Sequence, residues 1–305
     1  MSTAFLFPGQ GSQSAGIGQP WVDTPSWSIV TAASDATGVD VGHLLLDADA
    51  DELVDTANAQ LSTFVISLVV ADALASAGVV PEHVAGHSLG EYSALAAGGW
   101  IDLGPGATLV AARGAAMREA AVANVGTMAA IIGLEVDDVV AVCDHVDGHV
   151  WVANDNAPGQ VVIAGSAAAI EAAGELAKER GARKPMALKV AGAFHTPYME
   201  PAQAALDDAI AAVEFGDGTP TPWANVDGAS HDHPVDWPRL LSAQLCSPVR
   251  WRAEVEAMAA AGVDTVVEVG PGTVLGGMVK RIAPEVTRLA AATPDDVTSV
   301  AAQLR

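Results

Sequence analysis

Short apolar segments that end in glycine are the strongest constraint on how this chain can fold. Residues 265–269 form a continuous, mostly apolar run that leads directly into Gly-Pro-Gly, and residues 84–87 form a second short run. A strand with one face in water would alternate apolar and polar residues over a longer stretch. Continuous runs instead indicate strands that are buried on both faces, as in a parallel sheet between two layers of helices. The sequence therefore predicts an α/β fold.

Helical apolar spacing fills the intervals between these strands, over residues 26–37, 62–77, 105–124, 201–213, 237–245 and 251–261. Residues 125–192 differ, because the order there is strand, helix, strand, strand, helix, strand. This order is typical of a ferredoxin-like βαββαβ module. We therefore expect a large α/β-hydrolase-like domain with a central, mostly parallel sheet from residues 1–124 and 193–305. The ferredoxin-like subdomain is inserted into it at residues 125–192.

The acidic composition limits the partners of the chain. Its net charge of −23 argues against nucleic acid, because a phosphate backbone needs a positive surface. The uncharged, largely apolar stretch of residues 57–71 is too short to span a bilayer, and residues 1–11 do not resemble a signal peptide. We expect a cytoplasmic protein without a membrane segment, in which Cys143 and Cys246 are free, buried thiols.

The basic residues are unevenly distributed. All fourteen Lys and Arg residues lie at or after Arg113, and Arg180, Arg183, Lys184 and Lys189 fall within ten residues. Such a cluster is either the docking site for an acidic partner or an ordinary solvated rim.

Residues 86–90 read Gly-His-Ser-Leu-Gly, a G-x-S-x-G pattern. The pattern follows a predicted strand and opens a predicted helix, the setting in which it presents a nucleophilic serine on a sharp turn. Backbone N–H groups at the start of the helix can then bind a developing oxyanion. Ser88 is therefore a candidate nucleophile, and the alternative is a helix N-cap serine between packing glycines.

A serine nucleophile needs a base, and the chain offers eight histidines. His195 is the strongest candidate, because it lies in a loop of small apolar residues between a strand and a helix. His87 adjoins the serine, and we expect its side chain to point to the opposite side of the turn. His231 and His233 share a loop, but no third ligand is apparent, so we expect no metal site.

Arg113 lies in the middle of a predicted helix among small apolar residues. An arginine in such a place either extends its head group to the surface or faces a buried carboxylate. Its planar guanidinium suits two-point binding of a carboxylate, which lysine would not match. These residues alone leave both alternatives open.

Eight motifs follow one another along the chain, at residues 7–13, 86–95, 113–114, 128–134, 158–165, 193–195, 248–251 and 268–272. In this order and spacing they resemble the malonyl-CoA–acyl carrier protein transacylase family over almost the whole length. Two small departures are Thr196, where the family commonly has serine, and Asp155, where it often has an aromatic residue.

The resemblance implies a catalytic role for several matching residues. Ser88 would be the nucleophile, His195 its general base, and the backbone carbonyl of Gln244 the group that orients His195. The backbone N–H groups of Gln10 and Leu89 would form the oxyanion hole.

The resemblance also implies how the acyl group is held. Arg113 would bind the free carboxylate of the malonyl group, and Met117 and Phe194 would line the acyl pocket. Phe194 would crowd a branched acyl group, so malonyl would be preferred over methylmalonyl.

The implied reaction is a ping-pong transfer of malonyl from malonyl-CoA, a coenzyme A thioester, to the phosphopantetheine thiol of an acidic acyl carrier protein. It would supply fatty-acid synthesis and needs no tightly bound cofactor. The carrier needs a positive docking site, and we assign it to Arg180, Arg183, Lys184, Lys189, Lys280 and Arg281.

Three alternatives share these residues. A standalone polyketide acyltransferase would differ in its carrier, and a Ser-His thioesterase or other hydrolase would use water as the acceptor. Arg113 argues against the hydrolase, because a carboxylate clamp has no role with a neutral acyl ester. The third alternative, a catalytically silent carrier-binding module, is disfavoured because the nucleophile, the base and the clamp are all present.

Overall fold

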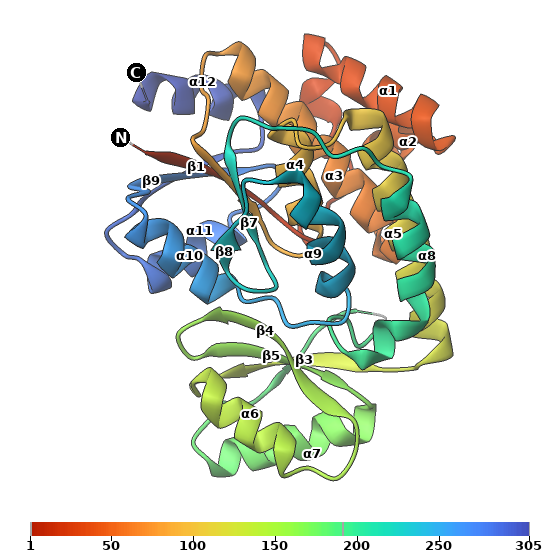
Figure 1. The fold of residues 1–305 in the computed structure, drawn as a ribbon, viewed down its shortest axis with the longest axis vertical. Coiled ribbons are helices and arrows are strands. Elements are labelled where there is room, and N and C mark those ends of the chain that lie inside the picture. Colours follow the sequence, from red (N-terminus) through yellow and green to blue (C-terminus); the bar gives the residue numbers. More distant parts are fainter. Residues whose placement is uncertain (1, 191, 305) are drawn as a thin grey trace.

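The computed structural model describes residues 2–190 and 192–304, and it contains two separate sheets (Figure 1). The larger sheet has six strands in the order β10-β9-β1-β2-β7-β8. Its neighbours are parallel from β10 to β7, and β8 at the edge is antiparallel. These strands are β1 (Thr3–Phe7), β2 (His83–Gly86), β7 (Thr221–Ala224), β8 (Ala229–Ser230), β9 (Thr265–Val269) and β10 (Thr287–Ala291).

Helices cover both faces of this sheet. They are α1 (Ser28–Thr37), α2 (Val41–Leu46), α3 (Thr56–Ser76), α4 (Leu89–Ala97), α5 (Leu103–Ala123), α8 (Glu200–Ala211), α9 (Trp237–Gln244), α10 (Trp251–Ala260), α11 (Val274–Ile282) and α12 (Pro294–Gln303). Along β1, Phe5 and Phe7 pack into the cluster that holds α3, α4 and α5, whereas Ala4 and Leu6 pack against α10 and α11. The strand is thus buried on both faces, as the continuous apolar runs predict.

α3 runs through the core of the large domain. The sequence predicts a helix over residues 62–77, but the helix begins at Thr56, where the Asp55 side chain caps its N-terminus. At 21 residues it is the one helix in the described part of the chain that is long and apolar enough to cross a membrane, and most of it is buried inside the protein. The prediction that this segment is too short to span a bilayer is therefore wrong. The helix instead packs inside the core of the protein.

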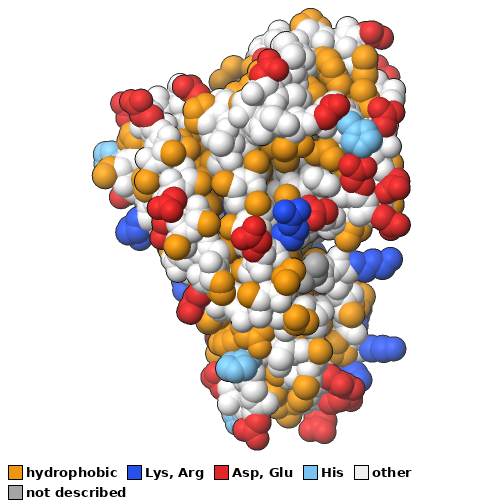
Figure 2. All heavy atoms as spheres, turned by 90° about the vertical axis from the view of Figure 1, so that its right-hand side faces the viewer, with side chains coloured by type: hydrophobic (Ala, Val, Ile, Leu, Met, Phe, Trp, Pro, Cys, Tyr) orange, Lys and Arg blue, Asp and Glu red, His pale blue; other side chains and the backbone are white. Residues whose placement is uncertain are grey.

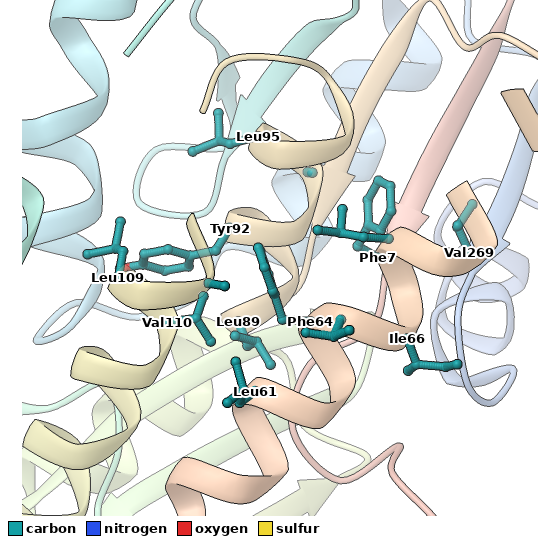
Figure 3. Close-up of a cluster of buried hydrophobic side chains, with 14 of the residues drawn as sticks. Phe7, Leu61, Phe64, Ile66, Leu89, Tyr92, Leu95, Leu109, Val110 and Val269 are labelled. Carbon is teal, nitrogen blue, oxygen red and sulfur yellow. The ribbon is translucent and has the colours of Figure 1, made fainter. Parts of the chain in front are cut away.

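Figure 3 shows how α3 meets the helices beside it. Leu61 and Phe64 of α3 lie next to Leu89, the first residue of α4. Tyr92 extends from α4 towards Leu109 of α5. The segment that follows Ser88 is therefore held in a fully packed core from its first turn.

The smaller sheet lies at one end of the molecule (Figure 1) and has the order β4-β5-β3-β6, with every pair antiparallel. Its elements are β3 (Thr127–Ile132), α6 (Val136–Asp144), β4 (Val150–Ala157), β5 (Gln160–Gly165), α7 (Ala167–Glu179) and β6 (Met186–Ala187). Ile131 and Ile163 pack on one face with α6 and α7, whereas Met128 and Val162 belong to the core of the large domain. The predicted fold class is confirmed, and the boundaries at residues 125 and 192 stay a prediction.

The last strand of the smaller sheet is shorter than expected. The sequence predicts a strand over residues 185–190, but β6 ends at Ala187. Leu188 and Val190 instead line a pocket between the two sheets. The apolar residues of this segment thus serve the pocket rather than the sheet.

Candidate active site

The G-x-S-x-G segment forms a sharp turn between β2 and α4. A Cβ atom on Gly90 would lie 2.0 Å from the carbonyl oxygen of Phe7, and one on Gly86 would lie 2.0 Å from the carbonyl carbon of Gly90. Both positions therefore require glycine, because the end of β1 lies against Gly90 and the first turn of α4 lies against Gly86. The N–H of His87 donates to the same Phe7 carbonyl at 3.0 Å. The turn is thus held against the carboxyl end of the central sheet.

Two residues other than glycine have positive φ in the described part of the chain, Ser88 at 54° and His195 at 61°. Such backbone is strained for residues with a side chain, and it persists where the surrounding structure enforces it. Ser88 also has ψ of −105°, outside the ordinary left-handed region. The strain is located at the two residues that the sequence predicts as nucleophile and base.

Ser88 and His195 are in contact, and Gln244 orients the histidine. Ser88 Oγ lies 2.8 Å from His195 Nε2, and His195 Nδ1 lies 3.0 Å from the main-chain oxygen of Gln244. A carbonyl oxygen accepts, so Nδ1 carries the proton and Nε2 is free to accept the Ser88 hydroxyl proton. Burial, with the nearby charge of Arg113, lowers the pKa of His195 to about 3, which keeps the imidazole neutral at pH 7.

Arg113 reaches the same point from α5 and is fully buried. Its Nη2 donates to Ser88 Oγ at 3.2 Å and to Gln244 Oε1 at 3.0 Å, and its Nη1 donates to Gln60 Oε1 at 2.7 Å. Its Nε has no partner within the described structure, and its Cζ lies 5.0 Å from the centre of the Tyr92 ring. The guanidinium is therefore next to the nucleophile, not at the surface, with hydrogen-bonding capacity left for an anionic ligand.

A cavity of about 170 Å³ opens at Ser88, between the large domain and the smaller sheet. Its walls include every residue that the sequence assigns to the oxyanion hole and the acyl pocket, namely Gln10, Leu89, Met117 and Phe194. Leu89 is the first residue of α4, so its N–H has no carbonyl partner one turn earlier in the helix. The cavity thus combines an apolar wall with a nucleophile, a base, a cation and free amides.

His87 also lines this cavity, so the expectation that it points to the opposite side of the turn is wrong. Its Nε2 lies 2.8 Å from Asn156 Oδ1, and its ring meets Trp251 edge to face at 5.7 Å between centroids. Asn156 is on β4, so this contact joins the turn to the smaller sheet. Burial lowers the pKa of His87 and keeps it neutral. The direction of the His87 side chain is therefore set by its contact with Asn156 of the smaller sheet, and not by the local geometry of the turn alone.

Asn225 holds the turn at Ser88 through side-chain hydrogen bonds, a role that the sequence does not predict. Its Oδ1 accepts from the N–H of Ser88 at 2.7 Å, and its Nδ2 donates to the carbonyl oxygen of Gly86 at 2.8 Å and to Glu254 Oε2 at 2.9 Å. Its own N–H donates to Glu91 Oε2 at 3.0 Å. The signal that could have found it is its place at the carboxyl end of a predicted parallel strand, where functional side chains of such sheets gather.

Comparison with known proteins identifies the family. Residues 4–298 match the family described as acyl transferase domain. The chain belongs to this family. It is 38% identical over 299 residues to the malonyl CoA-acyl carrier protein transacylase of Bacillus subtilis, covering 96% of this chain and 94% of that one. The Escherichia coli protein of the same name is 39% identical over 298 residues, with 95% and 96% covered.

Solved structures of related acyl transferases have the same fold. The acyl-carrier-protein S-malonyltransferase of Burkholderia pseudomallei superposes with a TM-score of 0.95 at 40% identity, covering 99% of this chain and all of the other. A malonyl-transacylase solved in complex with a type II polyketide synthase acyl-carrier protein also gives 0.95, at 34% identity, covering 99% and 100%. The resemblance stated from the motifs, and the prediction of an acyltransferase, are confirmed.

The six basic residues assigned to carrier docking in this acyl transferase are all exposed. Arg183 and Arg281 line one hollow beside the turn between β4 and β5, where Arg281 donates to the carbonyl oxygen of Pro158. On the face shown in Figure 2, the upper part carries acidic side chains and no basic ones, whereas the basic side chains lie in the middle and lower parts. The structure therefore brings two of the six together, and their role stays a prediction.

A larger hollow of about 430 Å³ lies away from Ser88, between α3 and the segment around Gly98. Asp72 is the one charged residue in its wall. The described residues of its wall include no serine–histidine pair, whereas Ser88 and His195 meet in the smaller cavity.

Proposed function

We propose that this acyl transferase moves a malonyl group from malonyl-CoA to the phosphopantetheine thiol of an acyl carrier protein through a malonyl-Ser88 intermediate. The observation that carries the proposal is the buried guanidinium of Arg113, whose Nη2 lies 3.2 Å from Ser88 Oγ. A cation at this distance from the nucleophile suits an acyl group that ends in a carboxylate. The names of the relatives, which are transacylases or transferases of malonyl groups, support the same substrate.

The acylation step follows from the contacts at Ser88. Its hydroxyl gives its proton to His195 Nε2 while Oγ attacks the thioester carbonyl. The N–H groups of Gln10 and Leu89 would stabilise the oxyanion, and Arg113 would hold the malonyl carboxylate. The protonated His195 then returns its proton to the sulfur, so coenzyme A leaves as a thiol and the malonyl ester of Ser88 remains.

The second half repeats the sequence in reverse. The carrier thiol gives its proton to His195 and its sulfur attacks the malonyl ester, after which Ser88 recovers the proton and malonyl-carrier leaves. Gln244 retains the proton of His195 on Nδ1 throughout, because its carbonyl oxygen only accepts. Nucleophile, base and anion-binding groups all belong to the chain, so we propose no tightly bound cofactor.

The intact mass of the protein after brief exposure to malonyl-CoA tests this proposal. We expect a malonyl adduct on the native protein, none on Ser88→Ala, and a much weaker one on Arg113→Ala. Acetyl-CoA should give less adduct than malonyl-CoA on the native protein, and Arg113→Ala should remove this difference. Steady release of coenzyme A without an adduct and without a carrier would instead favour a hydrolase.

The exposed basic residues Arg180, Arg183, Lys184, Lys189, Lys280 and Arg281 are our proposed carrier-docking surface. Charge reversal at Arg183 and Lys184 should slow transfer to the carrier and spare acylation by malonyl-CoA, because docking concerns the second half-reaction alone. Lys178→Glu is a matched control, since this exposed lysine lies on α7, on the outer face of the smaller sheet. Equal losses in both half-reactions would refute the docking assignment.

Fatty-acid synthesis in the cytoplasm is the setting that we propose. A polyketide pathway is the second candidate, favoured by the structural neighbour that was solved with a type II polyketide synthase carrier. Transfer rates to carriers of the two pathways, measured side by side, distinguish them. The preferred carrier should differ from the other mainly in kcat/KM of the second half-reaction.

A further inference from the structure

Arg113 carries a buried charge without a carboxylate in direct contact. Its hydrogen-bond partners are three uncharged groups on Gln60, Ser88 and Gln244, and no ion pair in the described part of the chain includes it. An isolated buried charge is strongly unfavourable, so a counter-charge is expected nearby. The question is which group supplies it before the substrate arrives.

The side-chain amide of Gln244 leads from Arg113 to such a group. Its Oε1 accepts from Arg113 Nη2 at 3.0 Å, and its Nε2 donates to Glu91 Oε2 at 2.9 Å. One amide therefore separates the buried cation from a carboxylate that is itself completely buried. Glu91 Oε2 also accepts from the N–H of Asn225, but its Oε1 has no partner among the described residues. A carboxyl group with one unpartnered buried oxygen can hold a proton there.

A second buried carboxyl group lies beside the first. Glu254 Oε2 accepts from Asn225 Nδ2 at 2.9 Å, and its Oε1 has no partner in the part of the chain that the structure describes. Burial and the neighbouring Glu91 raise the pKa of Glu254 well above its ordinary value, which favours its neutral form. Burial raises the pKa of Glu91 to about 7, against the opposing effects of Asn225, Gln244 and Arg113. Of the two, Glu91 is the group that can change its charge in the working pH range.

We propose that Glu91 is the resident counter-ion of Arg113, and that it takes up a proton from solvent when the malonyl carboxylate binds to Arg113. This inference rests on the proposed function, because it needs a carboxylate at the guanidinium. The incoming carboxylate adds a second negative charge on the far side of the same cation. Like charges that share one counter-charge disfavour each other, and the protonation of Glu91 removes that repulsion. The carboxylate clamp is therefore coupled to a proton.

Four other titratable groups surround Glu91. They are Arg113 on α5, Tyr92 on α4, Asp227 after β7 and Glu254 on α10. The guanidinium is always charged, and burial raises the pKa of Tyr92 to about 12. Asp227 is exposed, and its Oδ2 lies 3.0 Å from His231 Nε2. Of these groups and Glu91, Glu91 has a pKa of about 7, so we assign to it a proton that is exchanged on binding near pH 7.

Calorimetric titration of the non-reacting Ser88→Ala protein tests the inference. Malonyl-CoA and acetyl-CoA are titrated at several pH values, each in two buffers with different ionisation enthalpies, so that the protons taken up are counted directly. The two ligands share every ionisable group of coenzyme A, so the difference between them isolates the carboxylate. We expect malonyl-CoA to take up more protons than acetyl-CoA near pH 7, by up to about one, and its advantage in Kd to shrink as the pH rises.

Two variants in the same background separate charge from structure. Glu91→Gln keeps an acceptor for Asn225 and Gln244 but cannot be charged, so the excess proton uptake should vanish and the advantage of malonyl-CoA should become independent of pH. Glu254→Gln keeps an acceptor for Asn225 and leaves Glu91 unchanged, so the excess uptake should persist. A purely structural role for Glu91 would weaken the binding of both ligands and leave the excess uptake in place, which would overturn the inference.

The outcomes also distinguish this inference from the proposed function. Equal binding of malonyl-CoA and acetyl-CoA at every pH would contradict the assignment of Arg113 as the carboxylate-binding residue. Both proposals would then be refuted. A clear preference for malonyl-CoA without excess proton uptake would overturn the inference about Glu91 alone. Thermal unfolding of each variant shows that the comparison is made on folded protein.

Discussion

The main-chain oxygen of Gln244 lies 3.0 Å from Nδ1 of His195, and this contact replaces the carboxylate of a conventional catalytic triad. The side chain of the same residue contacts Arg113 at 3.0 Å and the carbonyl oxygen of Ser88 at 2.9 Å. One glutamine therefore contacts the proposed base through its backbone and the proposed carboxylate clamp through its side chain. Any side-chain substitution separates the two functions.

Gln244→Ala should lower kcat/KM for malonyl-CoA and leave the pH dependence of the base unchanged. The main-chain contact to His195 remains, whereas Arg113 and Glu91 each lose a buried partner. A lost buried hydrogen bond costs about 1–3 kcal/mol, so a loss of roughly ten- to hundredfold is expected. Gln203→Ala is the control, because this glutamine bonds Ser242 outside the cavity. A loss as large with acetyl-CoA as with malonyl-CoA would show that the base had moved as well.

His195 should destabilise the folded protein in acid. Its pKa is lowered to about 3 in the folded state, whereas the unfolded chain binds the proton near the ordinary value of 6.5. The effect of His195 on the free energy of unfolding is therefore absent above pH 6.5. Below pH 6.5 the free energy of unfolding falls as the pH decreases towards 3. Between pH 8 and pH 5 the native protein should lose about 2 kcal/mol more unfolding free energy than His195→Gln, measured in urea. Equal losses in both proteins would mean that the imidazole is protonated in the folded state.

Gly90→Ala should distort the turn at Ser88 and destabilise the protein by about 3 kcal/mol or more, because its Cβ would lie 2.0 Å from the carbonyl oxygen of Phe7. Gly277→Ala is the matched control, since this glycine lies within α11 and an added Cβ would meet nothing within 4 Å. The control should gain about 0.5–1 kcal/mol from helix propensity. Thermal unfolding and malonyl adduct formation measure both. Normal acylation by Gly90→Ala would show that the close approach of β1 is not required.

Local pattern was sufficient to predict the elements that carry the site. The strand–turn–helix setting of Ser88 and the βαββαβ order of residues 125–192 depend on short-range spacing, and the structure has both. The sequence predicts a strand through Leu188 and Val190 because apolar spacing cannot distinguish a sheet edge from a pocket wall. The start of α3 at Thr56 was missed because that first turn is polar, although Asp55 before it was the available capping signal.

The supporting contacts could not be predicted from spacing, because they join residues that are distant in sequence. Asn225 meets Ser88 across 137 positions, and Gln60 meets Arg113 across 53. His87 was assigned to the wrong side of the turn for the same reason, since its partner Asn156 comes from the smaller sheet. The family resemblance supplied the role of Gln244, but nothing in it indicated that two buried carboxyl groups lie behind the nucleophile.

Arg252 should control how firmly the smaller sheet closes the cavity. Its Nε lies 3.0 Å from Asp155 Oδ2 and its Nη1 2.7 Å from Glu135 Oε2, so it joins α10 to β4 and to the start of α6. Asp155 is flanked by Asn154 and Asn156, which both line the cavity. Arg252→Ala would leave Asp155 half-buried without its partner, which should cost about 1–3 kcal/mol and raise KM for malonyl-CoA through a looser wall.

The control for Arg252 is Lys178→Ala, which breaks the exposed pair with Glu175 on the outer helix α7. Exposed pairs contribute about 0–1 kcal/mol, so its melting temperature and KM should stay close to those of the native protein. If Arg252→Ala lowers the melting temperature but leaves KM unchanged, the contact stabilises the join between the sheets without shaping the cavity. A rise in KM that Arg252→Lys reverses in part, because one ammonium can restore one of the two contacts, would show that the position of β4 sets the fit of the acyl group.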